Sequence, residues 1–180
     1  MRPTPGALNQ ADTTLTVLLE SDTETTYLRP ESRIDFRYTP TVNLLEVTSF
    51  QLDATDVSFA LGSVLRLDAF DIHIAHLSSE PSSAGFVDPG TGEVRVDASV
   101  SLAANVLTNL APGQVVPAAG AGSITLTGAF GYDAADGSVT LRDFQGHFGP
   151  VAMRYGNTVI ASIASNVTLD FEGTALPAAN

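Results

Sequence analysis

Three pairs of aspartates with the spacing Asp-x-x-Asp are the residues best suited to chemistry, because carboxylate oxygens are the ligands that Ca²⁺ prefers. The pairs are Asp53/Asp56, Asp68/Asp71 and Asp133/Asp136. Asp133 and Asp136 are the strongest pair, since they lie at the tip of a predicted hairpin that Gly137 closes. An aspartate at a turn also caps the backbone with its own side chain, which needs no metal. We therefore expect no cofactor, with Ca²⁺ at Asp133 and Asp136 as the one candidate.

The chain has three histidines, His73, His76 and His147, and their spacing does not favour a metal site. Residues i and i+3 of a strand point to opposite faces, so His73 and His76 do not share a face. The same rule separates Asp68 from Asp71 unless a β-bulge lies between them. We expect hydrogen-bonded or surface histidines.

The motifs of nucleophilic and phosphate chemistry are missing from the sequence. No serine lies in a Gly-x-Ser-x-Gly elbow, and the glycine-containing run 119–123 lacks the lysine and the helix of a phosphate-binding loop. The absence of cysteine excludes thiolate nucleophiles and Cys-ligated metals. Hydrolysis by paired carboxylates stays open, because such acids meet only in the fold. The sequence therefore leans against an enzyme without deciding the question.

The charge and the composition restrict the classes of partner that the protein can be expected to bind. Of 180 residues 44% are hydrophobic and 16% charged, and the net charge is -12, with every basic side chain an arginine. A coding preference for arginine explains the missing lysine more simply than adaptation to high salt does. Such a charge disfavours nucleic acid and anionic lipid as partners. No apolar run approaches the roughly 18 residues of a membrane span.

The elements that must position these residues are strands, because apolar residues alternate along most of the chain. Leu15, Val17 and Leu19 show this period of two. Turn residues at 88–92 and 133–137 predict two hairpins. The alternation changes parity near Asp68 and Ala69, which predicts a β-bulge. We expect about nine or ten strands in all.

One segment departs from the alternation. Ala103, Val106, Leu107 and Leu110 are spaced at i, i+3, i+4 and i+7, which predicts a short helix over 103–110. The run 114–123 is rich in alanine, glycine and proline, so we expect a loop that connects two strands and a candidate mobile lip.

Together these patterns predict an all-β fold, an antiparallel β-sandwich of the jelly-roll or Greek-key type with one short helix. The alternative is a closed β-barrel. The predicted organisation is an extended N-terminal arm at 1–12, a single domain at 13–176 and a C-terminal tail at 177–180. One domain suffices for a chain of this length.

Two functions fit this fold. The first is a non-catalytic structural or assembly module of a virion, an appendage or a surface layer, which would bind itself or another protein of the assembly. It would use the arm and outward apolar residues such as Leu18 and Val64. The second is a barrel or sandwich that binds a small apolar ligand, with cyclase or isomerase activity as an extension. We expect a soluble protein, either extracellular after signal removal or part of a virion or surface assembly.

Overall fold

The computed structural model describes residues 1–77 and 83–175. The regular secondary structure of these residues consists of β-strands alone. The all-β prediction is therefore confirmed. The described part contains no helix that could cross a membrane. The strands are β1 (Arg2–Pro3), β2 (Gln10–Val17), β3 (Glu20–Tyr27), β4 (Arg33–Thr39), β5 (Leu44–Ala54), β6 (Val57–Leu61), β7 (Leu65–His76), β8 (Ser83–Phe86), β9 (Glu93–Thr108), β10 (Val116–Tyr132), β11 (Ser138–Tyr155) and β12 (Thr158–Thr174).

All twelve strands belong to one antiparallel sheet. Its main path runs β3-β2-β12-β11-β10-β9-β7-β5-β4, and the short strands β1, β6 and β8 pair with β12, β7 and β5. Most neighbours are consecutive in the chain and joined by hairpins, as expected for an antiparallel sheet. A division into two packed sheets is not confirmed, so the sandwich and jelly-roll predictions have no support from the strand pairing.

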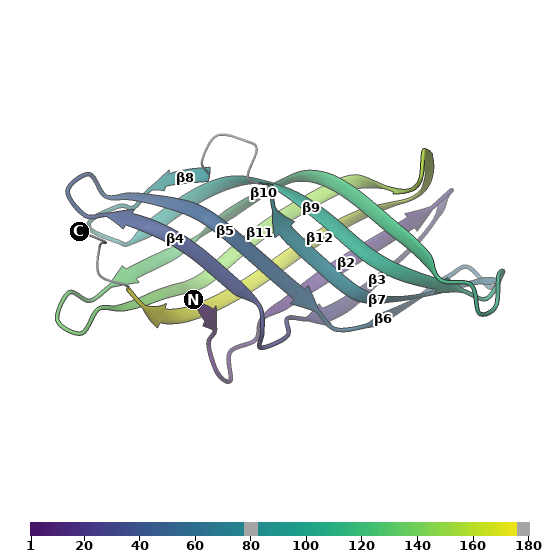
Figure 1. Ribbon diagram of the computed structural model, residues 1–180, viewed down its shortest axis with the longest axis horizontal. Coiled ribbons are helices and arrows are strands. Elements are labelled where there is room, and N and C mark those ends of the chain that lie inside the picture. The colour runs from purple at the N-terminus through teal and green to yellow at the C-terminus, as the bar shows by residue number, and fades with distance from the viewer. Residues whose placement is uncertain (78–82, 176–180) are drawn as a thin grey trace.

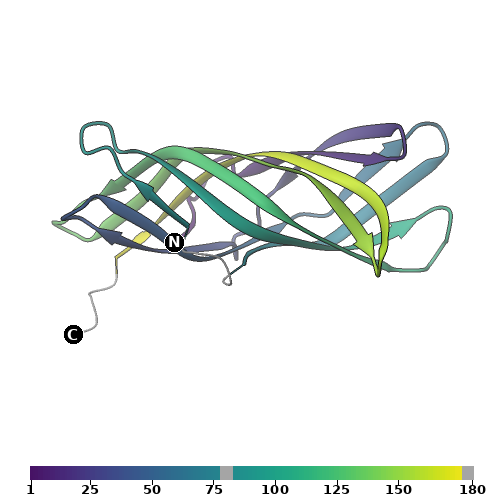
Figure 2. The same ribbon diagram turned by 90° about the horizontal axis from the view of Figure 1, so that it is seen from above.

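The sheet is curled into an elongated body, which Figures 1 and 2 show from two sides. Its two edges come together at isolated points. Leu28 forms a single bridge with Ala54, and Met1 exchanges backbone hydrogen bonds with Ile34 at 2.8 and 3.2 Å. No continuous ladder joins β3 to β4, so the alternative of a closed barrel is wrong. The physical reason is that the two edges of the sheet are joined only by these local backbone contacts and not by a pair of hydrogen-bonded strands.

The first twelve residues lie against their own chain. Arg2 and Pro3 pair with Glu172 and Phe171 of β12, and residues from Gln10 onward are already part of β2. The tail expected at 177–180 lies outside the described residues.

Two bulges contribute to the curvature. In β7 the register against β9 shifts by one residue between Phe70 and His73, and Asp71 between them has φ 50°. Asp143 in β11 has φ 52° at a similar shift. An extra residue on one strand bends it and increases its twist. The parity change expected near Asp68 and Ala69 is therefore a real bulge, displaced slightly to Asp71.

The helix predicted at 103–110 is absent, and this prediction was wrong. Residues up to Thr108 extend β9, and β10 begins at Val116, inside the run 114–123 that was expected to be a loop. Ala103 faces His73 of β7 on one side and Ala119 of β10 on the other. Neighbouring strands on both sides thus form hydrogen bonds with the backbone of this segment. This pairing overrides the weak helical preference of an eight-residue pattern.

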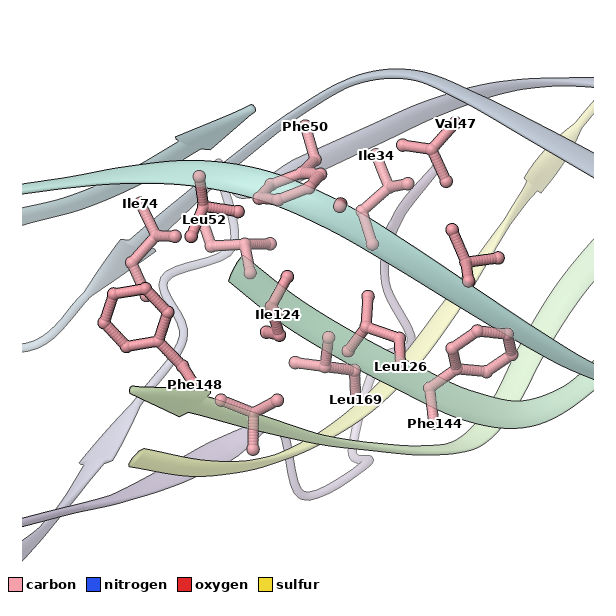
Figure 3. Close-up of a cluster of buried hydrophobic side chains, with 14 of the residues drawn as sticks. Ile34, Val47, Phe50, Leu52, Ile74, Ile124, Leu126, Phe144, Phe148 and Leu169 are labelled. Atoms are coloured by element: carbon pink, nitrogen blue, oxygen red, sulfur yellow. The ribbon is translucent and has the colours of Figure 1, made fainter. Parts of the chain in front are cut away.

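The interior is filled unevenly along the body. The main cluster of buried apolar side chains includes Phe50, Leu126, Phe144 and Leu169, which point toward one another between the strands in Figure 3. Near the β4–β5 hairpin, aromatic rings fill the space, and the ring centroids of Phe130 and Tyr38 lie 4.7 Å apart. A second, smaller cluster of Leu15, Phe59 and Leu61 lies toward the other end.

Candidate functional site

Asp133 and Asp136, the predicted Ca²⁺ residues, lie exposed in the turn between β10 and β11. Asp133 Oδ1 accepts a hydrogen bond from the backbone N–H of Ala135 at 2.8 Å, and Asp136 Oδ1 accepts one from Ser138 at 2.8 Å. The hydrogen bond from the Ser138 backbone is the main cause that lowers the pKa of Asp136. Both carboxylates therefore cap their own turn, and a Ca²⁺ site here stays a prediction.

The other two aspartate pairs each use separate partners. Asp56 forms an ion pair with Arg29 at 2.8 Å. Asp68 accepts a hydrogen bond from Ser58 at 2.6 Å, and Asp71 accepts one from Asn105 at 3.1 Å. Within residues 1–77 and 83–175 no three His, Cys, Asp or Glu side chains gather closely enough to hold a metal ion.

The three histidines also have separate partners. His76 Nε2 lies 3.2 Å from the Ser83 hydroxyl, and His147 Nδ1 lies 3.0 Å from Asn166 Oδ1. His73 Nδ1 contacts Asp53 Oδ1 across the β5–β7 pair. The structure thus does not bring the histidines together.

The Asp53–His73 pair is a feature that sequence reasoning missed, because nothing in the sequence says that these two residues face each other. Asp53 is only 6% exposed and also lies 3.1 Å from Gln51 Nε2. A carboxylate that accepts Nδ1–H orients an imidazole for proton transfer at Nε2. The pair alternates with Leu52, Ala54 and Ile74, which face the interior, so it lies on the outer face of the sheet.

A cavity lies inside the end of the curled sheet that is opposite the aromatic rings. Its volume is about 160 Å³, whereas a void lined by Phe36 and Phe144 is about 20 Å³. Its wall is formed by β2, β3, β5, β6, β7, β9, β10, β11 and β12. The lining residues are Ala11, Thr13, Leu15, Val17, Thr26, Leu28, Leu52, Ala54, Val57, Phe59, Leu65, Leu67, Ala69, Ile72, Ile74, Leu102, Ala104, Val106, Ala118, Phe148, Met153, Ile160, Ala161, Ile163, Ser165 and Val167.

Small side chains explain why this end is hollow. Alanines at 11, 54, 69, 104, 118 and 161 line the cavity, whereas Phe36, Phe130 and Phe144 fill the interior toward the opposite end. Leu65, Leu67 and Val106 are only half-buried although they line the cavity, because no side chain from the opposite wall covers them. The bulge at Asp71 keeps both Ala69 and Ile72 on the cavity wall, which strict alternation would not allow.

The wall is chemically uniform. None of its residues is charged, and its three hydroxyl side chains belong to Thr13, Thr26 and Ser165. The hydroxyls of Thr13 and Ser165 lie 3.0 Å apart, and Thr26 donates to the Ala11 carbonyl at 3.3 Å. In the described residues no buried side-chain nitrogen or oxygen lacks a hydrogen-bond partner. The cavity therefore presents apolar surface and no titratable group.

Comparison of the chain with protein-family models, with curated proteins and with solved structures gave no match.

Proposed function

We propose that the protein binds a small, uncharged, apolar molecule in the cavity inside the curled sheet. The observation that carries this proposal is a void of about 160 Å³ with no charged residue in its wall and with all its hydroxyls already hydrogen-bonded. A cavity of roughly 150 Å³ lined by aliphatic side chains holds one benzene molecule. A single aromatic ring or a short branched hydrocarbon therefore matches the available space.

The energetics of packing support an occupant. An unfilled apolar cavity lowers the free energy of unfolding, because its lining side chains lack packing partners. An apolar ligand offsets that cost by supplying the missing dispersion contacts. The lining residues carry no acid or base, so the proposal is one of binding and not of catalysis.

The test is a titration with toluene, followed by methyl NMR of lining residues such as Leu67, Ile72 and Ile163. Ala104 and Ala103 provide matched variants, because they are adjacent in β9 while Ala104 lines the cavity and Ala103 is exposed on the outer face. We expect Ala104→Leu to fill the cavity and to weaken toluene binding about tenfold or more. Ala103→Leu should leave the affinity unchanged.

Two results would contradict the proposal. Toluene that shifts none of the lining methyl resonances would show that the cavity takes no ligand. Equal affinities of Ala103→Leu and Ala104→Leu would place the toluene elsewhere. If Ala104→Leu lowers the stability, Ala161→Leu on β12 makes the same test from another strand of the wall.

An assembly role is the second candidate, and exposed apolar side chains favour it. The exposed fraction is 94% for Leu18 and 69% for Val64. Of the N-terminal residues that would reach a neighbour, Arg2 and Pro3 pair with β12 of their own chain. Sedimentation velocity over a range of protein concentrations tests this candidate, since an assembly module forms discrete oligomers and a small-ligand carrier does not need to.

A further inference from the structure

Four hairpin tips surround the hollow end, at the right of Figure 1. They are the turns between β2 and β3, β6 and β7, β9 and β10, and β11 and β12, each taken with two strand residues on either side: 16–21, 60–66, 107–117 and 154–159. Two hydrogen bonds link the β6–β7 and β9–β10 tips: Asn109 Nδ2 donates to the Val64 carbonyl at 2.7 Å, and Asn109 Oδ1 accepts from the Arg66 N–H at 2.9 Å. All four tips protrude from the same end of the molecule.

Apolar side chains are concentrated on these tips. Each of the four tips contributes at least one large hydrophobic residue to the surface. These residues include Leu18, Leu19, Val64, Leu110, Tyr155 and Val159, with exposed fractions from 51% to 97%. Scattered single apolar residues on a surface are normal, but a cluster at one end marks an interaction site.

Leu18 gives an independent indication that this surface has a role. It is the first residue of the two-residue turn between Val17 and Glu20, and its φ is 57°. Two-residue hairpins usually have glycine or asparagine at such a position, and the β6–β7 and β11–β12 tips do have Gly62 and Gly156 there. The Leu18 side chain is 94% exposed, so no packing within the chain offsets its strain.

The charges of the two ends differ in sign. The four tips of the hollow end contain Glu20, Arg66 and Arg154. The turns of the opposite end, bounded in the same way at 38–45, 85–94 and 131–139, contain four acidic residues and no basic one. The net charge of -12 therefore repels anionic surfaces from most of the molecule but not from the hollow end.

We propose that the four tips of the hollow end dock the protein on a zwitterionic lipid surface. Leucine and valine side chains insert among the acyl chains, Tyr155 lies at the headgroup level, and Arg66 and Arg154 face the phosphates. A lipid surface accepts separate protrusions without the complementary shape that a protein partner needs. The proposal goes beyond ligand binding and does not require the cavity to be occupied, although it places the hollow end where apolar molecules are most concentrated.

The experiment measures co-sedimentation of the full chain with vesicles of phosphatidylcholine. The test variant is Leu18→Gly, Leu19→Ser, in which glycine relieves the positive φ at position 18, so its unfolding transition should match or exceed that of the wild type. The control is Val42→Ser, Phe86→Ser at the opposite end, where Phe86 is 73% exposed. We expect the test variant to lose about tenfold or more in partition coefficient, and the control to bind as the wild type does.

Several outcomes would overturn the proposal. The wild type could fail to bind phosphatidylcholine, or bind only when phosphatidylserine is added, or lose equal affinity in both double variants. A dimer in sedimentation velocity that the Leu18→Gly, Leu19→Ser variant dissociates, without vesicle binding by the wild type, would assign this surface to a second copy of the chain. Toluene binding is measured in the test variant as well. If it persists, a loss of vesicle binding concerns the tips alone and not the proposed cavity function.

Discussion

Asp53 on β5 and His73 on β7 face each other across the outer side of the sheet, with Nδ1 of the imidazole hydrogen-bonded to the carboxylate. The acid is buried while the side chain of His73 is 52% exposed. His73 and Gln51 together cover a carboxylate that would otherwise be desolvated without sufficient partners.

Replacement of His73 by alanine should therefore destabilise the protein through the acid that is left behind. We expect a loss of about 1–3 kcal/mol in the free energy of unfolding, measured by urea denaturation at neutral pH. His147→Ala is the matched control, because His147 contacts the exposed Asn166 at 3.0 Å. Its loss should stay within about 0.5 kcal/mol, and equal losses in the two variants would contradict the prediction.

The hydroxyls of Thr13 and Ser165, 3.0 Å apart in the cavity wall, should be energetically coupled. Each single variant, Thr13→Val or Ser165→Ala, leaves one buried hydroxyl without its partner and should cost about 1–3 kcal/mol. The double variant removes both polar groups and should cost less than the sum of the two single changes. A thermodynamic cycle from four urea curves measures the coupling. Strict additivity would show that the two hydroxyls do not stabilise each other.

Acid should selectively weaken the turn between Val87 and Val94. Backbone N–H groups of Thr91 and Gly90 donate to Asp88 at 2.9 and 2.7 Å, and they hold the pKa of Asp88 below its ordinary value. A lowered folded-state pKa contributes stability above the unfolded value of about 3.9, and this contribution is lost as the pH falls through the folded-state pKa.

Asp88→Asn keeps an acceptor oxygen but removes the charge, which isolates this effect. The midpoint of thermal unfolding should be higher for the wild type than for Asp88→Asn at pH 7. The difference should shrink as the pH falls below about 4. A difference that stays constant down to the acid limit would show that the charge of Asp88 is not the cause.

Local chemistry explains which predictions from the sequence succeeded. The turns at 88–92 and 133–137 depend on aspartate and glycine within a few residues of one another, and Gly92 and Gly137 have φ of 76° and 72° as such turns require. The bulge near Ala69 could be predicted because one extra residue in a strand shifts all later apolar residues to the other parity. The predicted helix failed because its pattern covered only a few residues, and the backbone pairing that overrode it comes from β7 and β10.

The sequence by itself determined the all-β character, the main turns and the acidic charge, since each depends on the types of residues or on neighbours in the chain. Only the tertiary structure decided that the strands form one curled sheet, that Asp53 meets His73, and that alanines from six strands face a common void. Those relationships depend on which strands pair and in what register. Thr13 and Ser165 are 152 residues apart in the chain, and no local pattern encodes their contact.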